Sequence, residues 1–553
     1  MFTESKLAAL LVPVFFIGCL VACDVDKQVR ERPLEAWAFR SVLDKKPRML
    51  TLALDTACYA AYDLSTCTLY KVWKGGVLME GAAYSDKKNV QPTSWGTAYR
   101  TDSTASAQWI VERNGVAQPG MVDYQGYYFR ENQIHLQYIL ISAHDTISIE
   151  ERPEFIRTAN RAPAFERLIT LSSVPEGVTI SLQTGSSSIP LKSNGSTTSL
   201  LTLRELPDQF PPESAEGYDH RGRYFMEKSD CMTCHEADRG TVGPAFQAIA
   251  QKYPEEKTAI GYLVRKVQQG GSGVWGETAM NPHPDLSERE IREMLNYIFS
   301  LKPAESAEFN LVSEKKTAII SEPDKTKPGY GSALENVHPS FDVQTIRPPG
   351  FRPRVGGLAF LPDGRLLVTT WDTLGAVYLL DGVETGDTSR ISIKRIAIGL
   401  AEPLGIEVVD GEIFVLQKQE LTQLKDLDGD DVIDEYKVVC DSWGVTSDFH
   451  EFSFGLVHKD GHFYATLSMA MRLMSTERQH PDRGKTLRIS KDGSFEWINY
   501  GLRTPNGIGL GVDDEIFVTD NQGEWTPANK LIHVKKGEFL GMPWGLPKNI
   551  GEV

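Results

Sequence analysis

One short stretch of the chain combines residue types and spacing that suit a redox cofactor. Cys231 and Cys234 are separated by two residues, and His235 follows the second cysteine directly. In this CxxCH arrangement both thiols can add to the vinyl groups of a haem, while the imidazole ligates the iron from one side of the ring. A zinc site would need two more Cys or His ligands at similar spacing, and the sequence has none nearby. The motif predicts one covalent haem c.

The second axial ligand of the iron should come from a loop well beyond the motif. Met280 lies in a glycine- and proline-rich loop before the last expected helix, and thioether ligation raises the potential of an electron carrier. His283, three residues later, is the alternative ligand. Met232 lies within the attachment turn, and Met294 falls on the apolar face of a predicted helix, where core packing is the expected role. We therefore expect His235 and Met280 to ligate the iron.

Helical segments should surround the haem motif. The pattern predicts helices over residues 218–228, 259–269 and 287–301. The last begins at Ser287, a favourable N-cap, and then shows apolar residues at helical spacing. Together these segments predict an all-α unit over residues 217–303.

This unit resembles the class I cytochromes c. The matching features are the haem motif, Gly243-Pro244, Trp275-Gly276, Met280 and the closing helix. The resemblance implies that the carbonyl of Pro244 accepts the imidazole proton of His235 and so orients the ring. It also implies electron transfer to a redox partner rather than oxygen chemistry, because both axial positions are filled.

The last part of the chain, residues 341–553, repeats itself. Gly357, Gly405, Gly455 and Gly507 stand 48, 50 and 52 residues apart, and each opens a strand, an Asp-Gly or Asp-Asp turn and a second strand. A hairpin recurring about every fifty residues is typical of β-propeller blades. The repeats predict an incomplete propeller of about four visible blades.

Polar side chains precede each repeated glycine. In a propeller the inner strands begin near the central axis, so these residues should gather around one opening. They offer hydrogen-bonding groups and a general base; the alternative is that they pair with one another or with the backbone. The set is Arg354, Glu402, His450, Arg503 and Asn506.

The repeats resemble the soluble quinoprotein glucose/sorbosone dehydrogenases. The supporting residues are the segment Arg503-Thr-Pro-Asn506-Gly507, the segment Phe517-Val-Thr-Asp520, and His450. The resemblance implies that His450 takes the hydroxyl proton of a sugar or alcohol and that Arg503 and Asn506 contact pyrroloquinoline quinone. Two features depart from the family. His450 lies in Asp448-Phe-His-Glu-Phe rather than after a glycine, and four blades are visible where the family has six.

An acidic segment between two repeats resembles the first half of an EF-type calcium loop. Carboxylates occupy positions 1, 3, 5 and 9, and position 7 could supply a backbone carbonyl. Asp431 stands where glycine is usual, and Lys437 stands where a bidentate glutamate is usual. A solvated acidic loop is the alternative. The expected calcium ligands are Asp426, Asp428, Asp430, Val432 and Asp434.

Residues 34–205 have a β pattern of short apolar or alternating runs separated by turn residues. We expect a β-sandwich-like domain there. Its aromatic residues either line a sugar-binding face or, as aromatics usually do, fill the core. They include Trp73, Trp95, Trp109, Tyr124, Tyr127 and Tyr128.

The N-terminus has the pattern of an export signal. An apolar run ends in Leu20-Val21-Ala22-Cys23, which resembles a lipobox. We expect residues 1–22 to be a lipoprotein-type signal peptide, Cys23 to carry the lipid, and residues 23–33 to form a tether. The alternative is an ordinary signal peptide cut near Ala22. The protein should then be an exported, membrane-anchored lipoprotein that faces the periplasm or cell exterior.

The whole chain of 553 residues is acidic, with a formal net charge of −16 and no basic stripe, which argues against nucleic-acid binding. Polar linkers are expected at 206–216 and 304–340. The predicted protein is multidomain and couples oxidation of a sugar or alcohol at the propeller to the haem. The alternative is a non-enzymatic haem relay whose propeller and β-sandwich bind a partner or glycan.

Overall fold

The computed structural model describes most of the chain between residues 37 and 543. The predicted signal peptide, Cys23, most of both linkers, and Cys234 lie outside the described residues. No helix among the described residues has the length and apolar character needed to cross a membrane. The segments left out within this range are 82, 85–89, 103–108, 143–144, 185–186, 208–220, 230, 232–234, 240–242, 254–256, 272, 276–279, 281, 284–285, 287, 302–343, 472–478 and 524–527.

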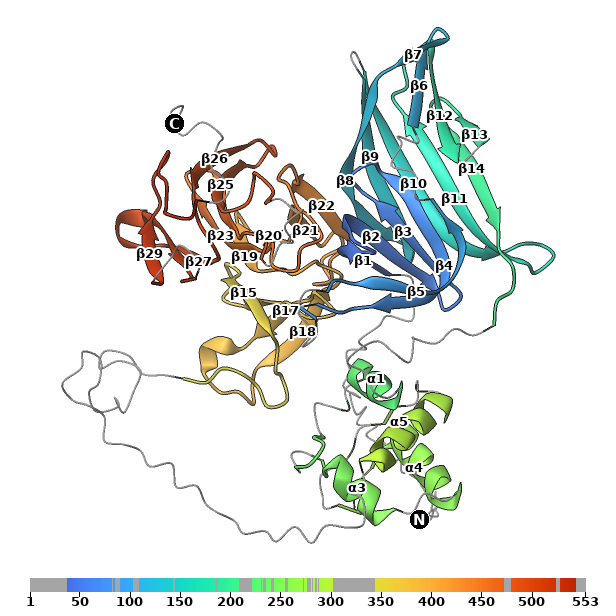
Figure 1. Ribbon diagram of the computed structural model, residues 1–553, viewed down its shortest axis with the longest axis vertical. Helices are drawn as coiled ribbons and strands as arrows, with labels where there is room; N and C mark the ends of the chain where they lie inside the picture. The colour runs from blue at the N-terminus through green and yellow to red at the C-terminus, as the bar shows by residue number, and fades with distance from the viewer. Residues whose placement is uncertain are drawn as a thin grey trace, which may run out of the picture.

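The N-terminal region consists of antiparallel sheets, as its alternating pattern predicts (Figure 1). One sheet has the order β1-β2-β3-β4-β5, and a second has β13-β12-β6-β7. Strands β8 to β11 and β14 belong to a third, larger sheet. The strands are β1 Trp37–Leu43, β2 Lys46–Asp55, β3 Cys58–Asp63, β4 Thr68–Leu78, β5 Thr93–Thr101, β6 Trp109–Arg113, β7 Val116–Gln118, β8 Gly120–Arg130, β9 Gln133–Ser142, β10 Thr146–Arg157, β11 Pro163–Ser172, β12 Val178–Thr184, β13 Ser187–Leu191 and β14 Ser196–Thr202.

The aromatic residues of this region fill its core. Trp73, Trp109, Tyr124, Tyr127 and Tyr128 are all buried, with at most 7% of each residue exposed. Ring pairs such as Trp109 and Tyr138, whose centroids are 6.3 Å apart, pack edge to face. The packing interpretation of these aromatics is confirmed for the five.

Four helices lie in the described part of the region that carries the haem motif. Three of them coincide with the predicted segments, and one additional short helix follows the motif. Buried Met294 lies in the common core with Phe246, Ile291 and Leu295, as its position on the apolar face predicts. The helices are α1 Arg221–Lys228, α3 Phe246–Lys252, α4 Lys257–Gln269 and α5 Glu288–Ser300.

Helix α1 crosses α5 at a glycine. A Cβ atom added at Gly222 would lie 1.9 Å from the carbonyl oxygen of Glu293 and 2.7 Å from Cβ of Tyr297. No real contact is this short, so the two helix backbones can approach only because residue 222 has no side chain.

Replacing Gly222 with valine should destabilise the helical domain by about 3 kcal/mol, because the new side chain must push the helices apart. Gly261, in the middle of α4, provides the control, since an added Cβ there meets only Arg265 Nη1 at 3.9 Å. Alanine at Gly261 should stabilise the domain by about 0.5–1 kcal/mol. Urea unfolding followed by haem absorbance measures both variants. Equal stabilities would contradict this helix packing.

Among the described residues, the C-terminal repeats form two four-stranded antiparallel sheets and one three-stranded sheet, and the four strands of the second repeat belong to a larger sheet. The innermost strands of the repeats lie in sequence order, with β15 beside β19, β19 beside β23 and β23 beside β27. The described residues do not close this arrangement into a ring. The strands are β15 Val355–Phe360, β16 Leu366–Thr370, β17 Val377–Asp381, β18 Ser392–Ala397, β19 Gly405–Val409, β20 Glu412–Leu416, β21 Leu421–Lys425, β22 Glu435–Cys440, β23 Ser453–Lys459, β24 His462–Leu467, β25 Lys485–Ser490, β26 Phe495–Tyr500, β27 Pro505–Leu510, β28 Ile516–Asp520 and β29 Lys530–His533, with 3₁₀ turns η1 Val383–Thr385 and η2 Val512–Asp514.

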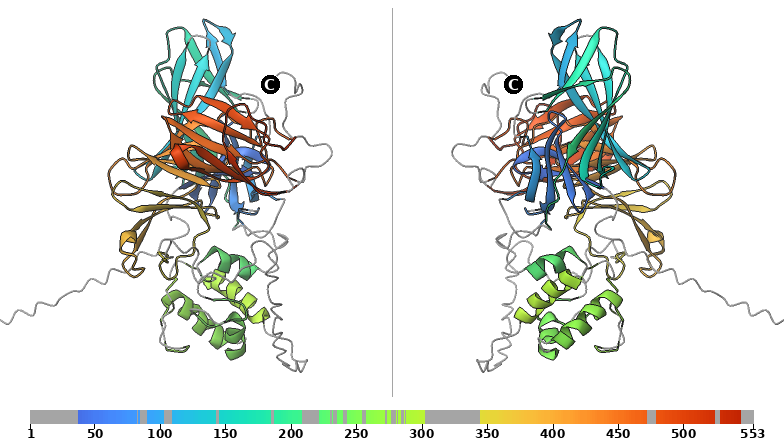
Figure 2. Two further views of the ribbon diagram at one scale, coloured as in Figure 1. Left: turned by 90° about the vertical axis from the view of Figure 1, so that its left-hand side faces the viewer. Right: turned by 90° about the vertical axis from the view of Figure 1, so that its right-hand side faces the viewer.

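The N-terminal sheets and the repeats share one nine-stranded sheet, because β22 of the second repeat pairs with β8. Gly126 permits the approach, since an added Cβ would lie 2.2 Å from the carbonyl oxygen of Tyr436. Tyr127 stacks on Tyr436 with ring centroids 4.6 Å apart. The two β regions therefore have a common core, whereas the helices gather in a separate body (Figures 1 and 2).

Candidate haem site and propeller mouth

The imidazole of His235 is held in one orientation. The backbone N–H of His235 donates to the carbonyl of Cys231 at 3.1 Å, which closes the attachment turn. Its Nδ1 lies 2.7 Å from the carbonyl oxygen of Pro244, the contact that the cytochrome resemblance implies. Because a carbonyl only accepts, Nδ1 carries the proton and Nε2 keeps its lone pair for a metal.

Two neighbours fix the plane of this ring. Phe246 stacks on it with centroids 5.2 Å apart. A Cβ added at Gly243 would lie 2.4 Å from Cε1 of His235, so a side chain there would displace the imidazole. The Gly-Pro pair therefore serves the histidine twice, since the glycine leaves space and the proline carbonyl accepts the proton. Cys231 lies beside Ser229, with Sγ and Oγ 3.1 Å apart.

The loop that carries both candidate distal ligands is fixed by backbone hydrogen bonds. Met280 and Gly271 exchange two of them, at 2.8 and 3.0 Å, and the N–H of His283 donates to the carbonyl of Val267 in α4 at 2.9 Å. Met280 and His283 are both partly buried. Met280 remains the predicted ligand because thioether ligation suits an electron carrier.

The Met280→Ala variant should keep covalent haem but lose the near-infrared sulfur-to-iron absorption band, and its reduction potential should fall because the thioether is lost. His283→Ala is the matched control and should keep the band. Visible and near-infrared spectra of the ferric proteins, with a redox titration, measure both effects. A wild type that lacks the band, with a haem spectrum that changes in His283→Ala but not in Met280→Ala, would assign the ligand to the histidine.

His450 lies in the predicted mouth of the propeller as a neutral base. Its Nδ1 is 2.9 Å from the carbonyl oxygen of Met469, so Nδ1 donates and Nε2 is an acceptor. Burial lowers the pKa of His450, and the nearby cation of Arg503 lowers it further, although the Met469 contact opposes the shift. An imidazole held neutral in this way can accept a proton at neutral pH.

Arg503 is partly buried, and its guanidinium has one buried donor that is not used. Its backbone N–H donates to the carboxylate of Asp520 at 3.1–3.2 Å, and Nη1 donates to Thr504 Oγ1 at 3.2 Å. The side chain lies against Gly523, where an added Cβ would be 2.1 Å from Cζ. Nε is buried and has no hydrogen-bond partner among the described residues. A buried, unpaired cationic donor of this kind fits an anionic ligand.

Two buried cationic residues near the mouth, Lys418 and Arg483, were not predicted from the sequence. Lys418 and Arg483 are each 1% exposed, and Lys418 Nζ lies 3.8 Å from the carboxylate of Glu402 and 2.9 Å from the carbonyl of Asp448. Burial raises the pKa of Glu402, although Lys418 and Arg483 oppose this. Lys418 and Arg483 stand in loops beyond the segments that precede the repeated glycines, which is why the repeat gave no signal for them.

The five predicted mouth residues are only partly brought together. His450 and Glu402 both lie near the buried cations Lys418 and Arg483, and Arg503 lies near His450. The guanidinium of Arg354 lies 4.8 Å from the ring centroid of Trp371, on which Phe452 packs edge to face, so Arg354 joins the rim. The fifth residue, Asn506, is exposed. Its backbone carbonyl accepts a hydrogen bond from the hydroxyl of Thr519 at 3.1 Å.

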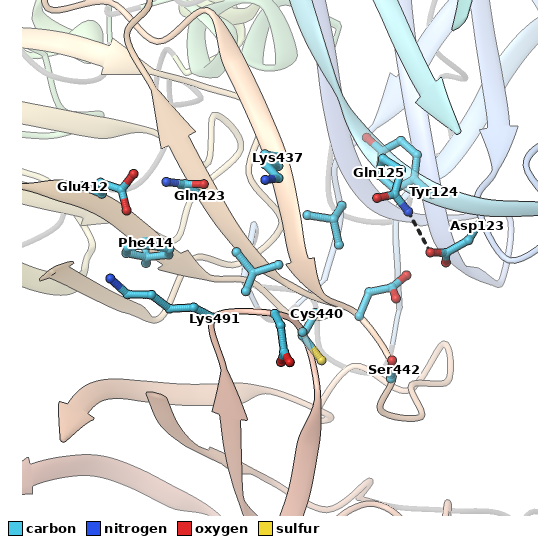
Figure 3. Close-up of a pocket in the computed structure, with 15 residues that line it drawn as sticks. Asp123, Tyr124, Gln125, Glu412, Phe414, Gln423, Lys437, Cys440, Ser442 and Lys491 are labelled. Atoms are coloured by element: carbon cyan, nitrogen blue, oxygen red, sulfur yellow. Dashed lines mark hydrogen bonds between the residues drawn. The ribbon is translucent and has the colours of Figure 1, made fainter. Parts of the chain in front are cut away.

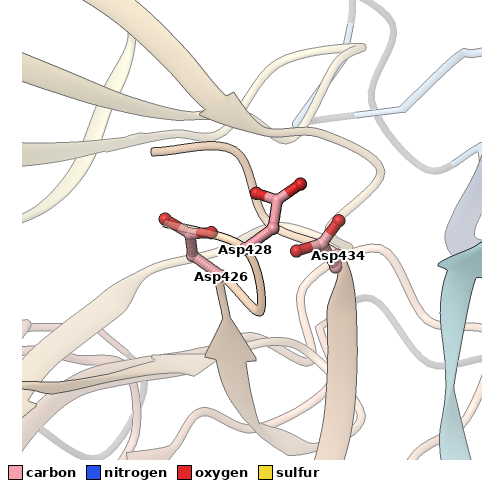
Figure 4. Close-up of side chains that lie close together, drawn as sticks. All are labelled: Asp426, Asp428 and Asp434. Atoms are coloured by element: carbon pink, nitrogen blue, oxygen red, sulfur yellow. The ribbon is translucent and has the colours of Figure 1, made fainter. Parts of the chain in front are cut away.

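The acidic loop gathers three of its five predicted calcium ligands (Figure 4). Asp426, Asp428 and Asp434 each place one carboxylate oxygen within 4.8 Å of the others. Asp430 instead accepts a hydrogen bond from the N–H of Val432 at 2.8 Å. Asp431 has a φ of +59°, so it adopts the left-handed conformation for which glycine is usual in such loops.

A polar cavity of about 500 Å³ lies at the seam between β8 and the second and third repeats (Figure 3). Asp123, Gln125, Lys437 and Lys491 are among its lining residues, and none of the residues predicted for the haem, the quinone or calcium is. Cys440 also lines it, but burial raises the pKa of this thiol and makes it a poor nucleophile. The cavity is separate from the haem site and from the mouth.

Comparisons with known proteins match the helical segment. The family model for cytochrome c matches residues 220–302. Cytochrome c-552 of Nitrosomonas europaea is 35% identical over 86 residues, which cover 16% of this chain and 84% of that protein. Cytochrome c-552 of Hydrogenobacter thermophilus is 38% identical over 86 residues, covering 16% of this chain and 87% of that protein.

A solved structure also aligns outside this segment. The PQQ-bound form of aldose sugar dehydrogenase from Streptomyces coelicolor aligns with 36% of this chain and 65% of its own, at 18% identity and a TM-score of 0.28. Similarity of that size does not fix a fold or an activity. The family relation rests on the helical segment, which covers most of the length of both cytochromes. Through residues 220–302, the chain belongs to the cytochrome c family.

Proposed function

We propose that the protein is an exported haem c oxidoreductase in which the propeller oxidises a hydroxyl group of a sugar or alcohol. The cytochrome c domain would then pass the electrons to a redox partner. The observation that carries the proposal is the pairing of two residues. His450 is a neutral imidazole with Nε2 as an acceptor, and the nearby Arg503 has a buried Nε donor without a partner among the described residues. A general base beside an anion-binding cation is the pairing that such an oxidation needs.

The residues present fit both implied cofactors. Thioether bonds from Cys231 and Cys234, with His235 and Met280 as axial ligands, would hold the haem. The free Nε2 of His235 fits this role, because Pro244 occupies Nδ1. For the quinone, the unpaired Nε of Arg503 is a fitting contact to one of its carboxylates, with Asn506 as the second predicted contact. Bound pyrroloquinoline quinone would supply a two-electron acceptor.

The chain's own side chains would accept the proton that the substrate hydroxyl releases. Nε2 of His450 would take the substrate's hydroxyl proton, while Nδ1 stays bonded to the carbonyl of Met469 and keeps the ring in place. The cations of Lys418 and Arg483 lower the pKa of His450 and so hinder protonation of its imidazole. Oxidation of the alcohol would release two electrons, and bound haem c would supply a carrier of one electron at a time.

The proposed protein also binds calcium and is anchored to a membrane. The clustered oxygens of Asp426, Asp428 and Asp434 would bind Ca²⁺ and tie the loop between β21 and β22. The export signal over residues 1–22 and lipidation at Cys23 would place the protein at a membrane surface, facing the periplasm or cell exterior, where haem c and its redox partners meet.

A spectrum of the purified chain tests the proposal. Pyrroloquinoline quinone and Ca²⁺ are added under anaerobic conditions, followed by a panel of aldoses and alcohols, and the ferrous haem band is recorded. At least one compound should reduce the haem. If the haem stays ferric with every compound but is reduced by dithionite, the dehydrogenase proposal fails. The haem would then be a relay whose β regions bind a partner or glycan.

A further inference from the structure

One loop of the N-terminal sheets reaches the propeller mouth. It connects β4 to β5, and its described residues are 79–81, 83–84 and 90–92. Two hydrogen bonds join it to the rim. Arg354 Nη1 donates to the carbonyl of Ala83 at 3.1 Å, and Gln91 Nε2 donates to the carbonyl of Asp448 at 3.2 Å. Asp448 also accepts the backbone N–H of His450 at 2.8 Å, so the second bond ends beside the proposed base.

The described parts of this loop are compact. Gly81 has a φ of +131°, and an added Cβ there would lie 2.7 Å from the carbonyl oxygen of Val90, so the two limbs touch at the base. The N–H of Tyr84 donates to the carbonyl of Gly81 at 2.9 Å, which closes a tight turn, and Ala83 is only 2% exposed. This packing fixes Tyr84 next to the residue that contacts Arg354.

The sheet that carries the loop is itself anchored on the propeller. The N–H of Arg40 in β1 donates to the carbonyl of Gly399 at 2.7 Å. The side chains of Arg40 and Glu420 form an ion pair at 2.7 Å, with 2% and 4% of them exposed. The sheet that carries the β4–β5 loop is therefore fixed to the C-terminal repeats, and so the base of the loop is fixed as well.

Tyr84 offers a free donor at this position. Burial raises the pKa of its phenol well above the ordinary value, and the carboxylates of Glu402 and Asp372 raise it further, so the hydroxyl keeps its proton. Glu402 belongs to the mouth already described. The Tyr84 hydroxyl has no hydrogen-bond partner among the described residues. A neutral phenol with an unused donor can bind an oxygen of a polyhydroxylated ligand.

We propose that the described part of the β4–β5 loop completes the propeller mouth, with Ala83 and Gln91 as its anchors and Tyr84 as a specificity-determining residue. The inference deepens the proposed function and rests on it for the identity of the substrate. In this arrangement the β4–β5 loop of the N-terminal region forms one side of the propeller mouth and contacts the hydroxyl groups of the substrate. Selectivity would follow because a site built to bond a hydroxyl disfavours an analogue that lacks it.

The anchoring is tested without any activity. Diethyl pyrocarbonate modifies exposed neutral imidazoles, and mass spectrometry of the peptide that contains His450 gives the rate at that residue. Gln91→Ala should raise this rate about threefold or more, because the mouth opens on the His450 side. Gln118→Ala is the control, since its amide contacts the exposed carbonyl of Val116, and its rate should equal wild type. An unchanged rate in Gln91→Ala overturns the loop assignment.

The role of Tyr84 is tested by haem reduction with the sugar that wild type oxidises. Tyr84→Phe should raise KM about tenfold and change kcat less than about twofold, because one ground-state hydrogen bond is removed. Tyr99→Phe, which loses a hydroxyl bonded to the carbonyl of Ala57 in the same sheet, should leave KM unchanged. An unchanged KM in Tyr84→Phe overturns its role. If wild type oxidises no sugar yet Gln91→Ala exposes His450, the loop assignment holds and the proposed function fails.

Discussion

Replacing His450 with glutamine should slow sugar-dependent haem reduction about 100- to 10,000-fold, the usual contribution of a positioned general base. Glutamine keeps a polar group of similar reach but cannot accept the substrate proton. Covalent haem and its spectrum should be unchanged, because His450 lies in the β region and the haem in the helical one. Anaerobic stopped-flow spectra of the ferrous haem band measure the rate.

His462 is partly buried and supplies the control, because its Nδ1 also contacts a backbone carbonyl, that of Asp460 at 2.7 Å. His462→Gln should reduce haem at the wild-type rate. In wild type the rate should rise with pH through a pKa below the ordinary histidine value of about 6.5 and then stay level, since burial lowers the pKa of His450 and the base acts when unprotonated. Equal rates for His450→Gln and wild type would remove His450 from the chemistry.

Replacing Glu151 with alanine should lower the free energy of unfolding of the β region by about 3–5 kcal/mol. Glu151 is fully buried and binds Arg167 through two hydrogen bonds, at 2.6 and 2.9 Å. It also accepts the hydroxyl of Tyr62 at 2.5 Å. Removing the carboxylate would leave the buried guanidinium of Arg167 without its counter-charge, which is the expensive part of the change.

Urea unfolding of the two variants separates a buried pair from a surface pair. Glu154→Ala breaks the partly exposed contact with Arg152, whose atoms are 3.7 Å apart, and should cost about 0–1 kcal/mol. The double variant Glu151→Leu, Arg167→Leu should be more stable than Glu151→Ala, because no charge is left unpaired. If Glu151→Ala and Glu154→Ala unfold alike, the buried network does not support this core.

The sequence predicted those features whose signal is local. The CxxCH motif and the Gly243-Pro244 pair anticipated the contact of His235 with a carbonyl, because both belong to one short segment. The spacing of the repeated glycines anticipated the four repeated hairpins, since each hairpin is built from neighbouring residues. Helix α3 was missed because seven residues give too few turns for a clear apolar period.

Contacts between distant segments carried no such signal. The pairing of β8 with β22 joins two edge strands about three hundred residues apart. Nothing in the sequence of an edge strand identifies the strand that it pairs with. The buried Lys418 reads as an ordinary polar loop residue in sequence, where lysine is normally exposed. Tyr84 likewise stands in a loop of another region. The mouth is therefore assembled from more of the chain than the repeats suggested.

The most direct test of electron flow from propeller to haem is the concentration dependence of haem reduction. The purified chain, loaded with pyrroloquinoline quinone and Ca²⁺, is mixed anaerobically with an active sugar at several protein concentrations, and the ferrous haem band is followed. A first-order rate that does not change with protein concentration is expected, because donor and haem belong to one chain. A rate proportional to protein concentration, or a haem that stays ferric, would contradict electron transfer within one chain from the propeller to the haem.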